Sequence, residues 1–367
     1  MHLSFIPGIT LCAQFYQEAV RPILHAHFPA LKYAAALLGS GSEVLGFDDQ
    51  TSTDHDWGPR LLLLVEAEAL PVAEHLRQVL AQQLPQTFHG YSTHFTLPDP
   101  TDGGTQQLQT CAEGPINHRV TVQSVGGFFA EYLGFDISHA LEPADWLTFS
   151  EHRLRSLTGG AVYYDAIGLE AVRSRFAYYP YDVWLYLLAA GWTRLGQEEH
   201  LMGRAGMVED EVGSAIIGAR LVRDIMRLCF LMAKTYAPYP KWWGTAFKQL
   251  PCATELWPVL ETAVHAHSWQ EREVQLVSAY EQLAVQHNAL GLTAPLPEQV
   301  KPFFGRPLQV IAQHGFAAAL LRCITDPAVR HIASRRVIGG LDMISDNTDL
   351  VADPFWRPFI RQLYQAP

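Results

Sequence analysis

The chain has 367 residues, of which 49% are apolar and 17% are charged, a composition typical of folded globular proteins and not of disordered or fibrous ones. Its 37 acidic and 26 basic residues leave a net charge of −11, which argues against a nucleic-acid partner, because gripping a phosphate backbone requires clustered Lys and Arg. The five cysteines are scattered and form no Cys-x-x-Cys pair, a usage typical of the reducing cytoplasm. The chain starts without a basic and then apolar leader, and its apolar runs are too short to span a membrane. We therefore expect a cytoplasmic protein with no membrane partner, long enough for two domains.

The first 140 residues or so carry a mixture of strand and helix signals. Short apolar runs bounded by Gly and Pro predict strands, and apolar residues three or four apart predict helices. The strand at 32–38 runs into a glycine-rich turn, after which Ser42 is placed to cap a helical turn. The elements expected in chain order are a helix at 9–27, a strand at 32–38, a strand or bent strand pair at 54–57 and 60–65, a helix at 71–84, and strands at 91–97 and 119–125.

Beyond about residue 140 the strand signals disappear, and eight of the nine Trp residues occur there. Apolar residues at helical spacing take their place. The main helices expected cover 181–195, 209–235, 253–267, 269–290 and 308–323. The sequence therefore predicts an α+β protein, with a small mixed-sheet domain at 1–140 followed by a larger all-α domain at 141–367.

The turn Gly39-Ser40-Gly41-Ser42 follows the first predicted strand directly. Glycine lets a backbone approach a ligand closely because no Cβ stands in the way. Backbone N–H groups and serine hydroxyls in such a turn can donate to phosphate oxygens. We therefore interpret Gly39, Ser40, Gly41 and Ser42 as a cradle for the phosphates of a nucleotide.

Asp54 and Asp56 lie two residues apart on a predicted strand. Alternate residues of a strand share a face, so both carboxylates are expected on one side. Two such acids can hold Mg²⁺, whose other ligands are water and substrate phosphates, and can support in-line phosphoryl displacement. We predict Asp54 and Asp56 as catalytic metal ligands.

Together these features resemble the signature of the nucleotidyltransferase (polymerase-beta-like) superfamily, in which Gly-Ser is followed by two alternate acids. Here thirteen residues separate Ser40 from Asp54, and Gly41-Ser42 fits the spacing equally well. The sequence also resembles, more closely, the domain-of-unknown-function family 4037, which is grouped with the nucleotidyltransferases. The segments 52–60, 196–201 and 239–247 carry this resemblance. The resemblance implies a nucleotidyltransferase-like fold, a helical C-terminal region and the reaction type, but no substrate.

Many members of the superfamily carry a third acid on a later strand, and the candidate strand here, residues 120–125, offers none. Three explanations stay open. The acid comes from the helical domain, as in antibiotic nucleotidyltransferases such as the kanamycin enzyme; one metal suffices, with Gln123 or water completing its shell; or the protein binds nucleotide without turning it over.

For a base from the helical domain, Glu198 and Glu199 are the candidates, because they fall in an acid-rich helical stretch. Arg204 can clamp a phosphate, or pair with Glu199 or Glu209. Lys241, in an aromatic-rich segment, can neutralise triphosphate charge beside a stacked base.

The leading hypothesis is a Mg²⁺-dependent nucleotidyltransferase that moves a nucleoside monophosphate, with AMP preferred, from ATP or another NTP to a hydroxyl of a small molecule or protein. In this hypothesis the helical domain binds the acceptor. The alternative is a non-catalytic nucleotide sensor or partner-binding protein on the same fold. The acceptor and the oligomeric state stay open.

Overall fold

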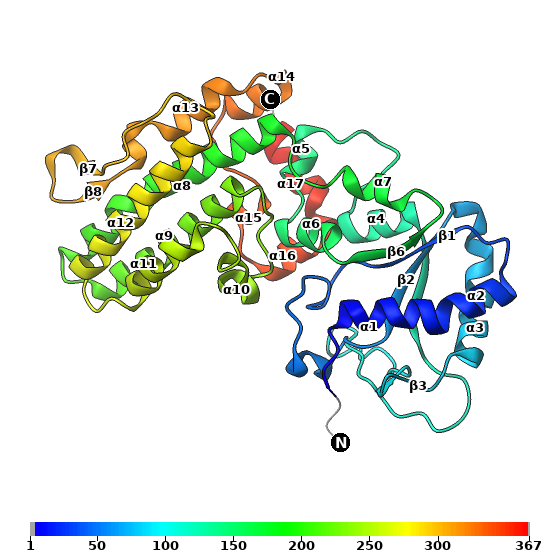
Figure 1. Cartoon of the computed structure of the whole chain (residues 1–367). Helices are drawn as coiled ribbons and strands as arrows, with labels where there is room; N and C mark the ends of the chain where they lie inside the picture. The colour runs from blue at the N-terminus through cyan, green and yellow to red at the C-terminus, as the bar shows by residue number, and fades with distance from the viewer. Residues whose placement is uncertain (1–3, 366–367) are drawn as a thin grey trace. The chain divides into compact units, whose positions relative to one another are not determined.

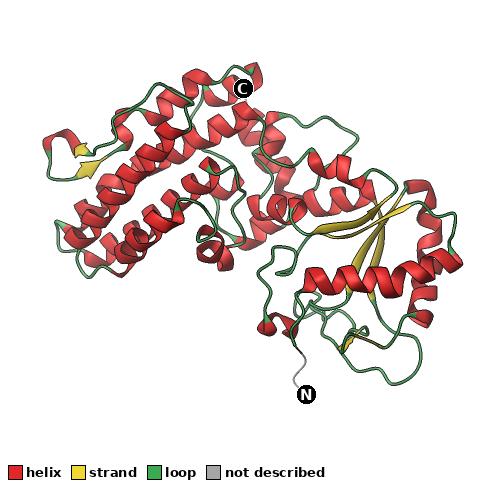
Figure 2. Cartoon of the chain, viewed as in Figure 1, coloured by secondary structure: helices red, strands yellow, loops and turns green. Residues whose placement is uncertain are grey.

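The computed structural model describes residues 4–365, which fall into two units. The first contains the residues up to Ala140 together with Arg153–Ala177, and the second contains Leu141–His152 together with the residues from Tyr178 onward. The four-stranded sheet belongs to the first unit, whereas helices dominate the second (Figure 2). The predicted α+β class is therefore confirmed.

The first unit is built on one mixed sheet with the strand order β5-β2-β1-β6. β1 pairs antiparallel with both β2 and β6, and β2 pairs parallel with β5. Its strands are β1 (Tyr33–Leu37), β2 (Arg60–Val65), β5 (Arg119–Ser124) and β6 (Ala161–Asp165), and a separate hairpin contains β3 (Thr87–Phe88) and β4 (Tyr91–Ser92). Its helices are α1 (Gly8–Phe15), η1 (Tyr16–Val20), α2 (Arg21–His27), η2 (Gln50–Asp54), η3 (Ala67–Val72), α3 (Ala73–Gln83), α4 (Val125–Leu133) and α7 (Leu169–Ser174), and α6 (Glu151–Thr158) spans the boundary between the units.

The N-terminal helical segment and α3 cover one face of this sheet (Figure 1). Apolar side chains of α1, η1, α2 and α3 pack with alternate residues of β2 and with Val120 of β5 in one core. Because side chains alternate along a strand, Thr121 and Gln123 of β5 point to the opposite face. That second face carries the candidate site.

The helix predicted at 9–27 is confirmed, with one π-helical turn, η1, between α1 and α2. Pro22, near the start of α2, offers no N–H to the preceding turn, and a π-helical turn accommodates such a gap in the bonding pattern.

The second unit is a helical assembly centred on α8 (Tyr181–Gly206), which packs along α9 (Glu211–Met232), α12 (Trp269–Ala289) and α13 (Phe316–Cys323). Every residue of α8 from Asp182 to Trp192 is buried. Trp192 stacks on Phe316 of α13 at 4.1 Å and donates to His287 of α12 at 3.2 Å, which joins three helices in one core. The remaining elements are α5 (Pro143–Trp146), η4 (Pro240–Trp242), α10 (Trp243–Phe247), α11 (Ala253–His265), β7 (Lys301–Pro302), η5 (Phe303–Gly305), β8 (Gln309–Val310), η6 (Ala312–His314), α14 (Pro327–Ala333), α15 (Leu341–Ile344), α16 (Thr348–Ala352), η7 (Pro354–Trp356) and α17 (Arg357–Gln365).

The prediction that strands end near residue 140 is wrong, because β6 completes the sheet beside β1. The short β7–β8 hairpin also interrupts the helical region. In β6 the sequence Ala-Val-Tyr-Tyr-Asp lies at the sheet edge and is only partly buried, so it lacks the apolar run by which the inner strands were found.

The predicted strand at 54–57 is also wrong. Asp54 is the last residue of the 3-10 helix η2, Asp56 has a φ of +52°, and β2 begins only at Arg60. The carboxylate of Asp49 caps this helix by accepting the N–H of Thr51 at 2.8 Å, and a left-handed residue at 56 cannot continue an extended strand. Asp54 and Asp56 therefore do not share one strand face.

Two smaller predictions also fail. No helix follows Ser42, whose carbonyl instead accepts the N–H groups of Leu45 and Phe47 and closes a series of turns. The strand predicted at 91–97 shortens to β4, because the later backbone divides its bonds between two segments: Phe95 donates to Asn117, and Thr96 donates to Gln107.

Candidate functional site

The turn after β1 presents backbone donors. Gly39 and Gly41 have φ values of +88° and +140°, conformations that favour glycine. The N–H of Gly39 donates to the carbonyl of Ser156 at 3.3 Å. Within residues 4–365, the N–H groups of Ser40, Gly41 and Ser42 donate to no acceptor. The turn can therefore offer N–H groups to an anion, as the sequence predicted for a phosphate cradle.

Arg60 holds this turn against the start of β2. Its Nε donates to Glu43 at 2.6 Å and its Nη2 donates to the carbonyl of Ser40 at 2.6 Å. Glu43 is only 1% exposed, so this is a buried ion pair. A Cβ at Gly41 would collide with the Arg60 guanidinium, which explains why glycine stands there. Burial opposes the charge of Arg60, but the Glu43 carboxylate outweighs it and raises the Arg60 pKa.

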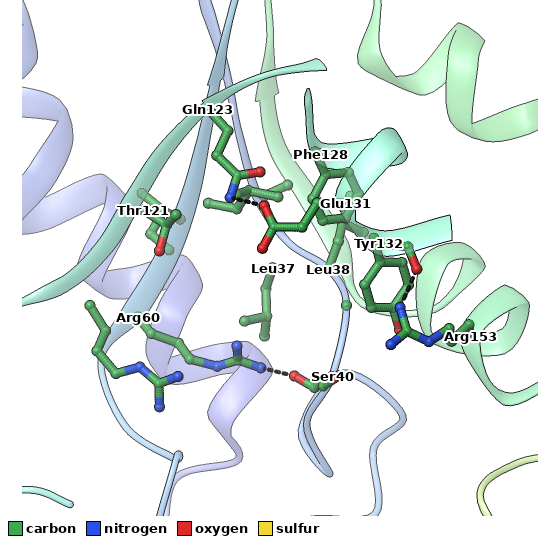
Figure 3. A pocket seen from close by; sticks show the side chains of 15 residues that line it. Leu37, Leu38, Ser40, Arg60, Thr121, Gln123, Phe128, Glu131, Tyr132 and Arg153 are labelled. Carbon is green, nitrogen blue, oxygen red and sulfur yellow. Dashed lines mark hydrogen bonds between the residues drawn. The ribbon is translucent and has the colours of Figure 1, made fainter. Parts of the chain in front are cut away.

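A cavity of about 290 Å³ opens beside the turn, on the sheet face away from α1 (Figure 3). The ends of β1 and the adjoining turn, the starts of β2 and β5, and helix α4 line it. Its polar lining consists of Ser40, Arg60, Arg119, Thr121, Gln123, Glu131, Tyr132 and Arg153. Three of these side chains are arginines, so the cavity suits an anionic ligand.

Arg60 and Arg119 lie opposite each other in the parallel register of β2 and β5. Both therefore stand at the amino-terminal edge of this strand pair. Burial and the charge of Arg60 lower the pKa of Arg119, against the pull of Asp56. A guanidinium group whose charge is opposed by a neighbouring guanidinium is stabilised in its charged form when an anion binds between them.

Helix α4 supplies another wall of the cavity. The Ser124 hydroxyl caps the helix by accepting the N–H of Gly127 at 3.0 Å. Phe128, Glu131 and Tyr132 then follow at three- and four-residue spacing, which places them on one face of α4, and all three line the cavity.

Tyr132 is fixed from both sides. Its ring lies parallel to that of Phe128 with centroids 5.5 Å apart, and the Arg153 guanidinium sits 4.8 Å from its centroid. Burial raises the pKa of the Tyr132 hydroxyl, against the opposing effect of the Ser156 and Ser40 side chains. Arg153 also donates to the Tyr132 carbonyl. These contacts order the cavity wall next to the turn.

The carboxylate in the cavity comes from Glu131. Its Oε2 accepts Nε2 of Gln123 at 3.2 Å (Figure 3). The Oε1 of Gln123 is buried and has no hydrogen-bond partner within residues 4–365. The strand predicted to lack a third acid carries none. Its Gln123, however, donates a hydrogen bond to Glu131, an acid of the following helix α4.

The two predicted catalytic aspartates are placed differently from each other. Asp56 accepts Nη1 of Arg119 at 2.6 Å, and it is 44% exposed. Asp54 is 64% exposed and contacts its own neighbour, with Oδ2 lying 3.0 Å from Nδ1 of His55. Asp56 is therefore joined to the cavity wall through Arg119, whereas Asp54 contacts solvent and His55.

Asp54 and Asp56 offer carboxylate oxygens, the ligand type that Mg²⁺ prefers. Within the described chain, no three His, Cys, Asp or Glu side chains gather as a metal cluster. Asp56 has one oxygen engaged by Arg119, and both contacts of Asp54 are to His55, so each keeps acceptor capacity for a ligand. Mg²⁺ needs only one or two carboxylates when water and phosphates supply the rest. Asp54 and Asp56 are the residues that could hold it.

Glu198 and Glu199 lie on α8 in the second unit and differ in environment. Glu198 pairs with Arg220 of α9. Glu199 is 4% exposed, accepts the N–H groups of Ile311 and Ala312 at 2.8 and 3.2 Å, and has its pKa raised by burial to about 7. Glu199 thus caps the backbone that leads into η6.

The other predicted cationic residues of the second unit are exposed. Arg204 is exposed on α8. Lys241 is exposed in η4, with its Nζ 4.4 Å from the centroid of the Trp242 ring. These positions leave both side chains accessible to a ligand.

Sequence reasoning missed Arg60, Arg119, Arg153 and Glu131. The predicted strand starts could have pointed to Arg60 and Arg119, since each is the first residue of its strand. Glu131 could have been found from Ser124, a good N-cap ahead of apolar residues at helical spacing. Arg153 lies on α6, far along the chain, and no local pattern brings it to this turn.

Residues 146–243 match the family model described as a domain of unknown function (DUF4037). The resemblance read from the sequence is confirmed over this stretch. Among solved structures, a nucleotidyltransferase-like protein from Exiguobacterium sibiricum 255-15 is similar, with 11% sequence identity over 80% of this chain and 81% of that chain and a TM-score of 0.32. No curated protein matches the chain.

None of the helices within residues 4–365 combines the length and the apolar character that crossing a membrane requires.

Proposed function

We propose that the protein transfers a nucleoside monophosphate from a nucleoside triphosphate to a hydroxyl of a small molecule or protein. The observation that carries the proposal is the glycine-serine turn, whose free N–H groups stand beside a cavity lined by Arg60, Arg119 and Arg153. Backbone donors and guanidinium groups together are suited to phosphate oxygens.

In the proposed reaction the acceptor oxygen forms a bond to the α-phosphorus. The bond from that phosphorus to the bridging oxygen of the β-phosphate breaks, and pyrophosphate leaves with the electron pair. The acceptor proton passes to a carboxylate. Arg60 and Arg119 would stabilise the charge on the transferring and leaving phosphates, and Ser40 would orient them from the turn.

Asp54 and Asp56 would hold Mg²⁺, which when bound would neutralise part of the triphosphate charge. The acceptor would bind in the helical unit, with Arg204 and Lys241 as cationic contacts and Glu198 or Glu199 as the base. Each of the two glutamates retains one carboxylate oxygen without a partner among the described residues.

The test is pyrophosphate release by the purified protein with four NTPs and a panel of hydroxyl acceptors. We expect Asp54→Asn and Asp56→Asn to lower turnover at least 100-fold while the circular dichroism spectrum stays unchanged. Glu66→Asn, an exposed acid beyond β2, is the matched control and should leave turnover unchanged. A wild-type protein that releases no pyrophosphate under any of these conditions would refute the proposal.

The ion pair between Asp56 and Arg119 favours a second candidate, a nucleotide sensor that does not turn its ligand over. Arg119 occupies an oxygen that a catalytic metal would need, while the cradle stays accessible. Calorimetry separates the two functions, since a sensor binds a triphosphate that is recovered intact after long incubation.

A further inference from the structure

The cavity of the first unit has two chemically different ends. Arg60 and Arg119 stand at the start of their parallel strands. Gln123 lies four residues further along β5, which at the usual rise of a strand is about 13 Å from Arg119. Glu131 joins Gln123 at that far end (Figure 3). A ligand that spans the cavity therefore meets cations at one end and a carboxylate at the other.

Between the two ends the lining includes the polar Thr121 of β5, and apolar residues such as Ala36, Leu38 and Leu62 also line the cavity. A nucleotide has the corresponding order of groups: charged phosphates, then a sugar, then a flat base with polar groups at its far edge. With phosphates at the arginines, the edge of the base comes to Glu131.

Glu131 is equipped to receive hydrogen-bond donors only. An ionised carboxylate has no donor of its own. Nε2 of Gln123 donates to Oε2 of Glu131. Within residues 4–365, Oε1 of Glu131 has no hydrogen-bond partner and Glu131 forms no ion pair. Its acceptor capacity is thus oriented and unused.

This chemistry discriminates among bases. Guanine presents two adjacent N–H donors, the ring N1–H and the 2-amino group, which match the two oxygens of a carboxylate. Adenine presents one amino donor beside a ring nitrogen that carries a lone pair, and that lone pair repels a carboxylate. Hypoxanthine keeps N1–H but lacks the 2-amino group.

We propose that the cavity selects a guanine nucleotide, with Glu131 reading the base edge, Gln123 positioning Glu131, and the arginines holding the phosphates. This inference rests on the proposed function for the location of the phosphates. It replaces the adenine preference expected from the sequence.

The experiment measures the dissociation constants of GTP, ITP and ATP by calorimetry, for the wild type, Glu131→Gln and Glu68→Gln. Glu68 is exposed on η3 and does not line the cavity, so it is the matched control. We expect the wild type and Glu68→Gln to bind GTP at least tenfold more tightly than ATP, with ITP between them. Glu131→Gln should bring the GTP-to-ATP ratio close to one, because an amide pairs with adenine as readily.

Equal or tighter binding of ATP by the wild type would overturn the inference, as would an unchanged ratio in Glu131→Gln or no binding of any nucleotide. Glu131 is exposed, so its substitution should not unfold the protein, and the GTP-to-ITP ratio of the wild type tests the same contact without a variant. Pyrophosphate release without base preference would refute this inference alone. Guanine preference without transfer would refute only the transferase proposal.

Discussion

Arginines pair with acids in both units, but in the first unit they also line a cavity. In the helical unit they are matched to acids: Arg194 to Asp224, Arg220 to Glu198, Arg223 to Asp346, Arg227 to Glu151 and Arg357 to Asp145. In the cavity of the first unit, Arg60, Arg119 and Arg153 converge with a single lining carboxylate, Glu131.

The difference teaches that a run of charges in a sequence does not mark a ligand site. Arg220, Arg223 and Arg227 recur at helical spacing on α9, yet each already has a carboxylate partner. Arg60 and Arg119 are isolated in the sequence and are brought together only by strand pairing. Arg60 and Arg119 also have carboxylate partners, Glu43 and Asp56, so the cavity is distinguished by the position of the two guanidinium groups on its lining, which only the fold reveals.

The buried pairs provide the largest expected effect. Glu43→Gln leaves Arg60 without its carboxylate, and removing one partner of a buried pair typically costs about 3–5 kcal/mol. Glu151→Gln in the helical unit should cost less, because Asp342 also contributes negative charge at Arg227. Urea unfolding of the two variants checks this order, and a smaller loss for Glu43→Gln would contradict it.

Glu199 predicts a pH dependence that belongs to the helical unit. Its folded pKa of about 7 lies above the ordinary 4.5, so the folded state binds more protons between these values. The free energy of unfolding must therefore fall as pH rises from 4.5 to 7, by up to roughly 3 kcal/mol, and level off above that.

Glu199→Gln should remove this slope, and Glu198→Gln should keep it, because the carboxylate of Glu198 is paired with Arg220. Urea unfolding at pH 5, 6, 7 and 8 measures both variants. Parallel pH curves for the wild type and Glu199→Gln would show that burial does not hold the proton.

The sequence predicts much of the frame of the molecule. Residues 60–65 and 119–124 form strands as expected, because short apolar runs next to turn residues favour a strand over a helix. Helices α9, α11 and α12 appear close to their predicted positions, since helical periodicity is a local property, whereas α8 begins at the predicted residue but extends to Gly206 and not to 195.

The candidate site is predicted only in part. Gly39 and Ser40 line the cavity, and Asp56 touches it through Arg119. Asp54 and Asp56 were expected on one face because alternate residues of a strand share a face. That expectation failed because Asp54 ends a capped 3-10 helix and Asp56 has a left-handed backbone conformation. Arg153 and Glu131 could not be assigned, because their approach to the turn depends on tertiary packing alone.

Arg119 offers the sharpest functional contrast with the helical unit. Arg119→Gln should weaken binding of inorganic tripolyphosphate by about 30-fold, since a hydrogen bond to a charged group contributes about 2 kcal/mol. Arg220→Gln makes the same change of charge on α9 and should leave the affinity unchanged. Calorimetry at 50 mM salt measures both. Equal weakening in the two variants would show that net charge, and not the cavity, binds the anion.

The smallest expected effect concerns two acids beside one arginine. Arg223 lies 2.8 Å from Asp346 and 4.0 Å from Asp224. Asp346 is 80% exposed, and its hydrogen bond with Arg223 lowers its pKa; burial raises the pKa of Asp224, which is 3% exposed. If distance alone mattered, Asp346 would be the stronger partner of Arg223. If burial matters more, Asp224 is the stronger partner.

We expect burial to determine which of the two substitutions destabilises the protein more. Asp346→Asn should lower the free energy of unfolding by less than about 0.5 kcal/mol, and this difference should disappear at 1 M NaCl because salt screens exposed pairs. Asp224→Asn should lower the free energy of unfolding far more, because it leaves Arg194 without its acid. The pH slopes should also differ in sign. A lowered pKa stabilises the fold above the ordinary value of 3.8 and is lost as pH falls, whereas a raised pKa makes stability fall as pH rises past 3.8. Urea unfolding of both variants between pH 3 and 7 measures these slopes, and slopes of the same sign would mean that proximity to Arg223 outweighs burial.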